Sequence, residues 1–272
     1  MSKIVAIDAG HGMNTPGKRT PDGEREWSFN KVVAESAIKY LNDYEGVKTI
    51  RLDDPTGKTD VPLKTRTDRA NQAKADILIS IHHNANTGRW GTWTGTETYT
   101  YIGSWPGAER LARIVHNKIV KVYGLRDRGL KKANFHMLRE SRMDAILVEG
   151  GFMDSTIDIK KMRDKKVLDN AGKAIAEGVA EYFGLKKKAK PKPSASKPSS
   201  NKLYKVQIGA YANKANADQQ AFRAKGRGFD HYIVRQDGLY KVQIGAYANK
   251  KNAEAQANKA KKAGFDVYIA YE

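Results

Sequence analysis

The stretch DILISIHH at residues 76–83, together with KIVAID at 3–8 and AILVEG at 145–150, decides the fold of the larger part of this chain. Each is a short apolar run, which is typical of a strand buried on both faces of a sheet. A fourth run, VKTIRL, occupies residues 47–52. Helical patterns alternate with these runs, at roughly 27–43, 63–74, 107–122 and 167–182. The alternation predicts an α/β domain over residues 1–185, with a central, mostly parallel sheet flanked by helices.

Polar side chains follow three of the predicted strands at the point where each strand ends. KIVAID leads to His11, DILISI leads to His82 and His83, and AILV leads to Glu149. Because open α/β sheets bind ligands at the carboxyl ends of their strands, we expect two histidines and a glutamate to meet in one cleft. Neighbouring strand residues face opposite ways, so His82 and His83 cannot both point into it.

This set of side chains suits zinc-dependent hydrolysis. A catalytic zinc takes three nitrogen or oxygen ligands and keeps a fourth position open, while a further carboxylate serves as general base. The ligand carboxylate would come from the loop PDGEREWSFN, which supplies Glu24 and Glu26. The residues alone do not separate these two glutamates.

The chain ends in a repeated unit. LYKVQIGAYANK at 203–214 recurs unchanged at 239–250, an offset of 36 residues. Each unit has the pattern of a strand, a helix and a second strand, and Asp237-Gly238 is a turn pair that joins the units as a hairpin. The order βαββαβ predicts a small α+β domain over residues 203–272, ferredoxin-like, with a four-stranded sheet backed by two helices.

Positive charge is most concentrated between the two predicted domains. The 272 residues carry 49 Lys and Arg against 30 Asp and Glu, a net charge of +19, of which +7 falls on residues 186–202. That segment, KKKAKPKPSASKPSSNK, is rich in lysine, proline and serine, so we predict an extended linker. Such a charge favours a polyanionic partner, which could be nucleic acid, an acidic membrane or an anionic cell wall.

Composition narrows the class of protein further. The chain has no cysteine, which excludes disulfides, thiolate zinc sites and cysteine nucleophiles. It has no run of about 18 apolar residues, so no membrane span is predicted. The first residues, MSKIVAIDAGHG, lack the apolar region and cleavage site of a signal peptide, so we expect synthesis in the cytoplasm without one.

Four motifs follow one another in the order of a known enzyme family. They are GHG at 10–12, Glu26 with Asn30 four residues later, SIHHNA at 80–85, and VEGGFMDS at 148–155. Over nearly all of residues 3–184 the chain resembles the zinc N-acetylmuramoyl-L-alanine amidases of the amidase-3 family, which are bacterial cell-wall hydrolases. The first motif continues as GHGMNTPGKRTPDGE where the family commonly has GHGG-x-DPGA. The substrate contacts of that loop are therefore not carried over.

The resemblance implies an activity and a set of site residues. The bond cleaved would be the amide between N-acetylmuramic acid and the L-alanine of the peptidoglycan stem peptide. The family's zinc ligands correspond to His11, Glu26 and His82, and its catalytic glutamate corresponds to Glu149, which would act as general base and then as general acid.

Three further polar residues are candidates for supporting roles. Asn84 and His136 are candidate substrate contacts, and we place His136 in the strand that precedes the Glu149 strand. Asp8 or Asn84 could also orient the histidines. For each of the three, a purely structural role is the alternative.

The repeated unit resembles the SPOR domain, a module that binds peptidoglycan glycan strands. The resemblance places the ligand on the open face of the sheet. Gln207, Gln243, Tyr211 and Tyr247 are candidates there, because amide and aromatic groups suit sugar hydroxyls and ring faces. The alternative for the tyrosines is packing within the sheet.

The pairing of the two modules is typical of Bacillus-type sporulation autolysins and of some phage endolysins. We therefore expect an enzyme that acts at the bacterial cell wall after release, either through a holin or by lysis of the mother cell. The linker lysines would concentrate it at anionic cell-wall polymers.

Two other functions compete with this one. A non-catalytic cell-wall-binding protein with a relict amidase domain is the first, and the presence of His11, Glu26, His82 and Glu149 argues against it. A basic nucleic-acid-binding protein is the second. RNA-binding RRM sheets share the order βαββαβ, but YKVQIGAY lacks their aromatic RNP pattern in both copies. No nucleic-acid partner is therefore expected.

Overall fold

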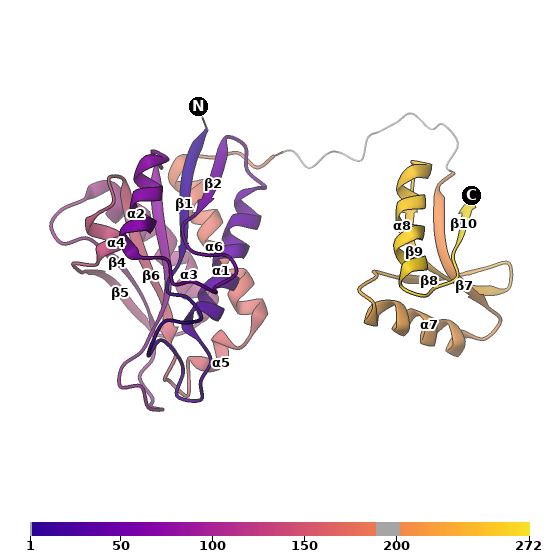
Figure 1. The fold of residues 1–272 in the computed structure, drawn as a ribbon, viewed down its shortest axis with the longest axis horizontal. Coiled ribbons are helices and arrows are strands. Elements are labelled where there is room, and N and C mark those ends of the chain that lie inside the picture. Colours follow the sequence, from indigo (N-terminus) through magenta and orange to yellow (C-terminus); the bar gives the residue numbers. More distant parts are fainter. Residues whose placement is uncertain (1, 189–201) are drawn as a thin grey trace. The chain divides into compact units, whose positions relative to one another are not determined.

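The computed structural model describes residues 2–188 and 202–272. The chain divides into two compact units, Met1–Lys190 and Pro191–Glu272 (Figure 1). Most of the predicted linker over 186–202 lies outside the described residues. Lys186 and Lys188 pair through their backbones with Glu45 and Asp43, so the first unit extends to at least Lys188.

The first unit is built on a six-stranded sheet with the order β2-β1-β3-β6-β4-β5. Its strands are β1 (Lys3–Ala9), β2 (Val47–Arg51), β3 (Ile77–Asn84), β4 (Thr96–Thr100), β5 (Asp127–Lys132) and β6 (Asp144–Phe152). The pairs within β2-β1-β3-β6 are parallel, whereas β4 runs antiparallel to β6. The predicted α/β fold with a mostly parallel sheet is confirmed.

Helices cover both faces of this sheet. They are α1 (Glu26–Leu41), α2 (Leu63–Gln72), α3 (Pro106–Tyr123), α4 (His136–Arg139), α5 (Ile159–Met162) and α6 (Lys165–Phe183). The long helices α1, α3 and α6 pack on one face around a buried cluster that includes Ile79 and Ile146 (Figure 1). The short helices α2 and α4 pack on the other face, over residues such as Leu78 and Leu147.

Alternation along the strands decides which residues face the short helices. His82 and Glu149 follow Leu78 and Leu147 at even spacing, so they lie on the same face, further toward the carboxyl ends of β3 and β6. None of the described helices is long and apolar enough to span a membrane.

The second unit has the predicted order of elements. It comprises β7 (Tyr204–Tyr211), α7 (Lys214–Gly226), β8 (Tyr232–Gln236), β9 (Leu239–Tyr247), α8 (Lys250–Lys262) and β10 (Tyr268–Tyr271). The sheet order is β10-β7-β9-β8 with antiparallel pairs throughout, and both helices pack on it around a small core. Asp237 and Gly238, both at positive φ, form the predicted hairpin turn.

The repeat makes this unit nearly two-fold symmetric. Gln207 of β7 pairs with Gln243 of β9, its own counterpart 36 residues later, so the pseudo-two-fold axis passes between them. Gln220 and Gln256 each donate a hydrogen bond to the carbonyl of an equivalent isoleucine, which ties each helix to the sheet in the same way.

Candidate metal centre

Three of the predicted ligands come together at the carboxyl ends of β1 and β3. His11 follows β1, Glu26 is the first residue of α1, and His82 lies near the end of β3. One possible ligand atom from each lies within 4.8 Å of the other two. Glu26 Oε1 is 3.0 Å from His82 Nδ1, and Glu26 Oε2 is 3.2 Å from His11 Nε2. We call these residues the metal triad.

The donor set fits zinc. Zinc takes histidine nitrogens and carboxylate oxygens at about 2.0–2.2 Å, so tetrahedral ligand atoms lie about 3.4 Å apart. Each histidine nitrogen lies 3.0 or 3.2 Å from a different oxygen of Glu26, and one donor atom from each of the three residues lies within 4.8 Å of the other two, which is close enough for one ion. Glu26 is only 2% exposed, and a buried carboxylate needs a positive partner. Two nitrogen donors, one carboxylate and burial together match a three-ligand zinc site.

Backbone geometry brings His11 against His82. A Cβ at Gly10 would lie 2.0 Å from the His82 ring, so only glycine allows this approach. His11 has a φ of +66°, a conformation that costs a non-glycine residue about 1–2 kcal/mol. The two rings lie edge to face, with their centroids 4.9 Å apart.

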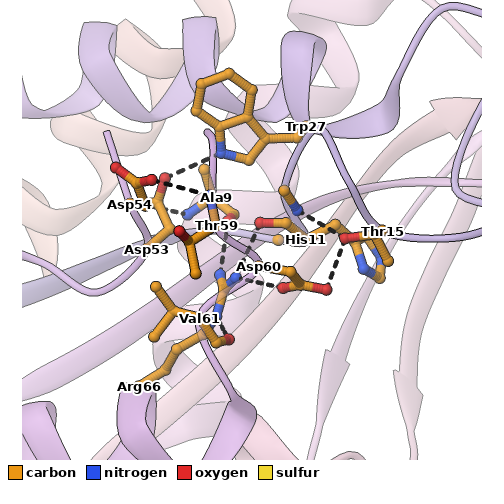
Figure 2. A network of polar contacts seen from close by, with 12 residues as sticks. Ala9, His11, Thr15, Trp27, Asp53, Asp54, Thr59, Asp60, Val61 and Arg66 are labelled. Carbon is orange, nitrogen blue, oxygen red and sulfur yellow. Dashed lines mark hydrogen bonds and ion pairs between the residues drawn. The ribbon is translucent and has the colours of Figure 1, made fainter. Parts of the chain in front are cut away.

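A buried arginine holds this strained loop in place. Arg66 of α2 donates hydrogen bonds to the carbonyls of Ala9 and His11, at 2.8 and 2.9 Å, and pairs with Asp8 at 2.7 Å. It also pairs with Asp60 at 2.9 Å, and Asp60 accepts a hydrogen bond from Thr15 of the same loop (Figure 2). Asp8 therefore supports His11 through Arg66, and its side-chain hydrogen bonds within the described residues come from Arg66 and Ser80, not from a histidine ring.

The start of α1 is fixed in a similar way. The Trp27 indole donates a hydrogen bond to Asp53 at 3.1 Å, and Asp53 also accepts one from the Ala9 amide (Figure 2). One turn into the helix, Asn30 donates to Glu26 Oε1 at 3.2 Å. These contacts tie the first turn of α1, and with it Glu26, to the ends of β1 and β2.

Electrostatic interactions within the triad favour the ionised form of Glu26 and the protonated form of His82. Burial raises the pKa of Glu26, but hydrogen bonds with His11 and His82 outweigh it, so that pKa lies well below 4.5. Burial lowers the pKa of His82, but its hydrogen bond with Glu26 outweighs burial and the pKa is raised above 6.5. Glu26 is therefore charged at neutral pH, as a metal ligand must be.

His83 faces away from the triad, as the strand geometry predicts. Its Nδ1 lies 2.8 Å from Asn30 Oδ1, and its Nε2 lies 2.9 Å from the Tyr123 hydroxyl. A neutral ring satisfies both contacts, by donating to the amide oxygen and accepting from the hydroxyl. Its backbone amide also donates to Glu26. His83 thus helps to position Glu26 and is not a ligand in this geometry.

The burial of His83 makes the metal-free protein sensitive to acid. Burial lowers the pKa of His83 to about 4, against 6.5 in the unfolded chain. Above pH 6.5 the ring is neutral in both the folded and the unfolded chain, so it costs no stability. As the pH falls from 6.5 toward 4, this residue lowers the free energy of unfolding by about 3 kcal/mol. We expect chemical unfolding to show this loss in the wild type and a flatter pH dependence in His83→Gln. The same pH dependence of stability in the wild type and in His83→Gln would show that His83 is not the source of the acid sensitivity.

Glu149 lies beside the triad on the next strand. It pairs in register with His82 across β3 and β6, and with Glu97 across β6 and β4, so the three side chains form a row on one face of the sheet. Its Oε2 is buried and has no hydrogen-bond partner among the described residues. Burial, reinforced by the charges of Glu26 and Glu97 against that of His82, raises the pKa of Glu149 to about 8. A carboxyl group with a raised pKa beside a candidate metal centre is a candidate for proton transfer.

A cavity of about 270 Å³ opens next to the triad. His11, His82 and Leu63 are among its lining residues. A larger cavity of about 630 Å³ lies elsewhere, lined by Asp76 and Asp144 at the amino ends of β3 and β6. Of these two cavities, the smaller one adjoins the metal triad.

The structure separates the two candidate ligand glutamates. Glu24 lies in the loop before α1 and forms an exposed ion pair with Arg163 at 2.7 Å, whereas Glu26 is buried in the triad.

Asn84 directs its amide to Glu97 Oε1 at 2.7 Å, not to a histidine. His136 was expected in a strand, and this placement is wrong. His136 is the first residue of α4, with Nε2 3.3 Å from the Thr67 hydroxyl, because Phe135 to Glu140 close a helical turn.

The predicted glycan-binding residues of the second unit differ in exposure. Gln243 is 1% exposed, Gln207 is also buried, and neither amide nitrogen has a partner among the described residues. Tyr211 and Tyr247 are half-buried, and each ring lies over a glycine two residues before it. The tyrosines therefore offer a ligand more surface than the glutamines do.

Two exposed tyrosines, Tyr232 and Tyr268, were not predicted from the sequence as glycan contacts. Tyr232 pairs with Gln243, and Tyr268 pairs with Gln207, so a Tyr-Gln-Gln-Tyr row crosses all four strands. Tyr268 is 68% exposed. The two tyrosines are 36 residues apart, so the repeat period was the signal that could have found them.

Fold and donor set together define an α/β protein with a candidate metal-dependent hydrolytic site. Residues 5–181 match the family model for N-acetylmuramoyl-L-alanine amidase (amidase-3), and residues 200–271 match that for the SPOR domain. The chain belongs to the N-acetylmuramoyl-L-alanine amidase family and carries a SPOR domain. The predicted family and amidase class are confirmed.

Individual relatives agree with this assignment. A sporulation-specific N-acetylmuramoyl-L-alanine amidase of Bacillus subtilis is 39% identical over 86% of this chain and 85% of its own length. An endolysin of Bacillus phage SPP1 is 34% identical over 76% of each chain. The crystal structure of an N-acetylmuramoyl-L-alanine amidase from Clostridium difficile 630 has a TM-score of 0.63 and 34% identity, and covers 67% of this chain and 97% of its own.

Proposed function

We propose that this chain hydrolyses the amide bond between N-acetylmuramic acid and L-alanine in peptidoglycan with a zinc ion held by His11, Glu26 and His82. One observation carries the proposal. The three donor groups lie within 4.8 Å of one another, and Glu149, the register neighbour of His82, has a buried carboxyl oxygen with no hydrogen-bond partner among the described residues. This arrangement supplies both a metal site and a separate proton carrier.

The roles of the residues follow from their positions. A zinc ion held by these three residues would lower the pKa of its bound water to about 7 and would polarise an amide carbonyl. A cation held beside Glu149, which is next to His82 in the strand register, would favour its ionised form despite the raised pKa. The carboxylate would then take a proton from the attacking water and deliver it to the leaving amine of L-alanine. Asn30 and the His83 amide hold Glu26 in place through hydrogen bonds. The products are a lactyl carboxylate on the muramic acid and a free amine on the peptide.

The second unit would anchor the enzyme to its substrate. Its match to the SPOR domain supports peptidoglycan glycan as the ligand. Among the predicted glycan contacts, Tyr211 and Tyr247 have side chains that are partly exposed and could touch the glycan. The buried Gln207 and Gln243 would support the sheet beneath it. The lysines of the segment 186–202 would add attraction to anionic cell-wall polymers.

The relatives suggest the biological setting. A sporulation amidase and a phage endolysin are both similar to this chain over most of its length. We propose an enzyme that reaches the cell wall after release, through mother-cell lysis or a holin. A cell-wall-binding protein without activity remains the alternative function, and a catalytic test separates the two.

Mass spectrometry of the fragments released from purified peptidoglycan tests the proposed function. The full chain, loaded with zinc, should release peptides with a new amino-terminal alanine and glycan with free lactyl carboxylates. A matched digestion with a chelator present should release neither. New reducing sugar ends, or cleavage within the peptide, would contradict the proposal, and no cleavage at all would favour a binding protein.

A further inference from the structure

A cluster of charged residues lies at the edge of the site, and the mechanism above does not use it. Glu97 of β4 is 2% exposed, and Arg128 and Lys131 of β5 both donate to its Oε2, at 2.6 and 2.5 Å. Its Oε1 accepts from Asn84 and Tyr99, each at 2.7 Å. We call Glu97, Arg128 and Lys131 the Glu97 cluster.

The cluster continues the row of catalytic side chains. His82 on β3, Glu149 on β6 and Glu97 on β4 are register neighbours, and β5 lies beyond β4. Glu149 is proposed to donate its proton to the leaving amine, so the peptide side of the substrate lies near Glu149. A peptide that extends from there away from His82 reaches Arg128 and Lys131.

Arg128 and Lys131 can donate more hydrogen bonds than Glu97 accepts from them. Glu97 already accepts four hydrogen bonds, two on each oxygen, and its single charge faces two positive charges. Arg128 and Lys131 are 30% and 35% exposed. Within the described residues the Nη atoms of Arg128 form no hydrogen bond, and Lys131 Nζ bonds only to Glu97. The Glu97 cluster by itself therefore presents free donors and one excess positive charge.

We infer that Arg128 and Lys131 form a subsite for a carboxylate on the peptide side of the scissile amide. Glu97 is their positioning residue, because a buried carboxylate with four donors fixes both cations on the β5 edge. Strands lie about 4.8 Å apart, so β5 is about 10 Å from β6. One extended residue spans about 3.5 Å, and the cationic side chains reach back toward β6. The carboxylate therefore belongs to the residue that follows L-alanine.

The inference rests on the proposed function, and two synthetic substrates test it. They are N-acetylmuramoyl-L-alanyl-D-glutamic acid and its neutral diamide, each hydrolysed by the full chain loaded with zinc. We expect the wild type to have a KM about tenfold lower for the free acid, because charge-assisted hydrogen bonds favour the carboxylate. In Lys131→Gln and in Arg128→Gln this preference should fall to about threefold or less. Lys131→Arg should retain it.

Lys132→Gln is the matched control. Lys132 is the neighbouring lysine, but it pairs with Glu109 on α3, so the preference should stay near tenfold. Equal preference in the wild type and in both neutral variants would overturn the subsite. So would a Lys131→Gln enzyme that keeps the preference but loses inhibition by N-acetylmuramic acid, because the cations would then bind the lactyl carboxylate of the product. Cleavage of neither substrate would refute the proposed function instead.

Discussion

Replacing Glu149 by glutamine (Glu149→Gln) is expected to lower kcat about 10³-fold while zinc remains bound. The residue is not one of the three triad ligands, but it lies beside His82, and its buried Oε2 has no hydrogen-bond partner in the part of the chain that the structure describes. Glutamine fills the same space and cannot transfer a proton, so the loss reflects general acid–base catalysis. Peptide release from purified peptidoglycan, with metal analysis of the same sample, measures both quantities. A variant with zinc and undiminished kcat would exclude Glu149 as the proton carrier.

The same substitution should stabilise the metal-free protein. Burial raises the folded-state pKa of Glu149 to about 8, above its ordinary value of 4.5. The ionised form is therefore disfavoured in the fold, and stability is lost as the pH rises from 4.5 through 8. Glu149→Gln removes this loss and should gain about 3 kcal/mol at pH 7. Reduced stability of the variant at pH 7 would show that the carboxylate is well accommodated in the fold.

Replacing Arg66 by methionine (Arg66→Met) is expected to cost about 3–5 kcal/mol of unfolding free energy. Arg66 is 1% exposed, and it pairs with the equally buried Asp8 while holding the carbonyl of His11. Its removal leaves the buried Asp8 carboxylate with the hydrogen bond from Ser80 but without an opposite charge, which is far more costly than losing an exposed ion pair. Because the His11 loop loses its anchor, zinc affinity should fall as well. Denaturant unfolding and metal titration measure the two effects.

Arg69→Met is the control for that experiment. Arg69 lies one turn further along α2, is exposed, and donates a single hydrogen bond to the carbonyl of Leu52. Its loss should cost less than about 1 kcal/mol. Adding Asp8→Asn to Arg66→Met should recover part of the stability, since the uncompensated charge is then gone. Equal costs for Arg66→Met and Arg69→Met would mean that the buried ion pair contributes no more than a single part-buried hydrogen bond.

The strongest strands and the site at their ends could be predicted from the sequence. β1, β3 and β6 are apolar runs buried on both faces, and their polar ends meet because parallel strands share an edge. β4 and β5 were missed. TETYT and DRGLKK are polar, and the buried threonines of β4 carry no apolar pattern. The Glu97 cluster lies on these two strands, so it was missed with them.

Contacts distant in sequence explain the remaining differences. Glu24 and Glu26 are two residues apart in the sequence, and contacts with distant residues distinguish them: Glu24 pairs with Arg163, 139 residues away, whereas Glu26 pairs with His82. Arg66 lies 58 residues from Asp8 and gives no local signal of its burial. His136 was expected in the strand before the Glu149 strand, but the four residues from His136 to Arg139 form a helical turn there. Such pairings depend on the tertiary fold and leave no periodic pattern.

Zinc-edge X-ray absorption on the full chain, combined with metal analysis, tests the metal triad most directly. We expect about one zinc per chain, with two imidazole nitrogens and one carboxylate oxygen among its ligands. The signal should be lost in Glu26→Ala and retained in Glu24→Ala. A chain that binds no zinc, or one whose zinc environment is unchanged in Glu26→Ala, would contradict the proposed centre.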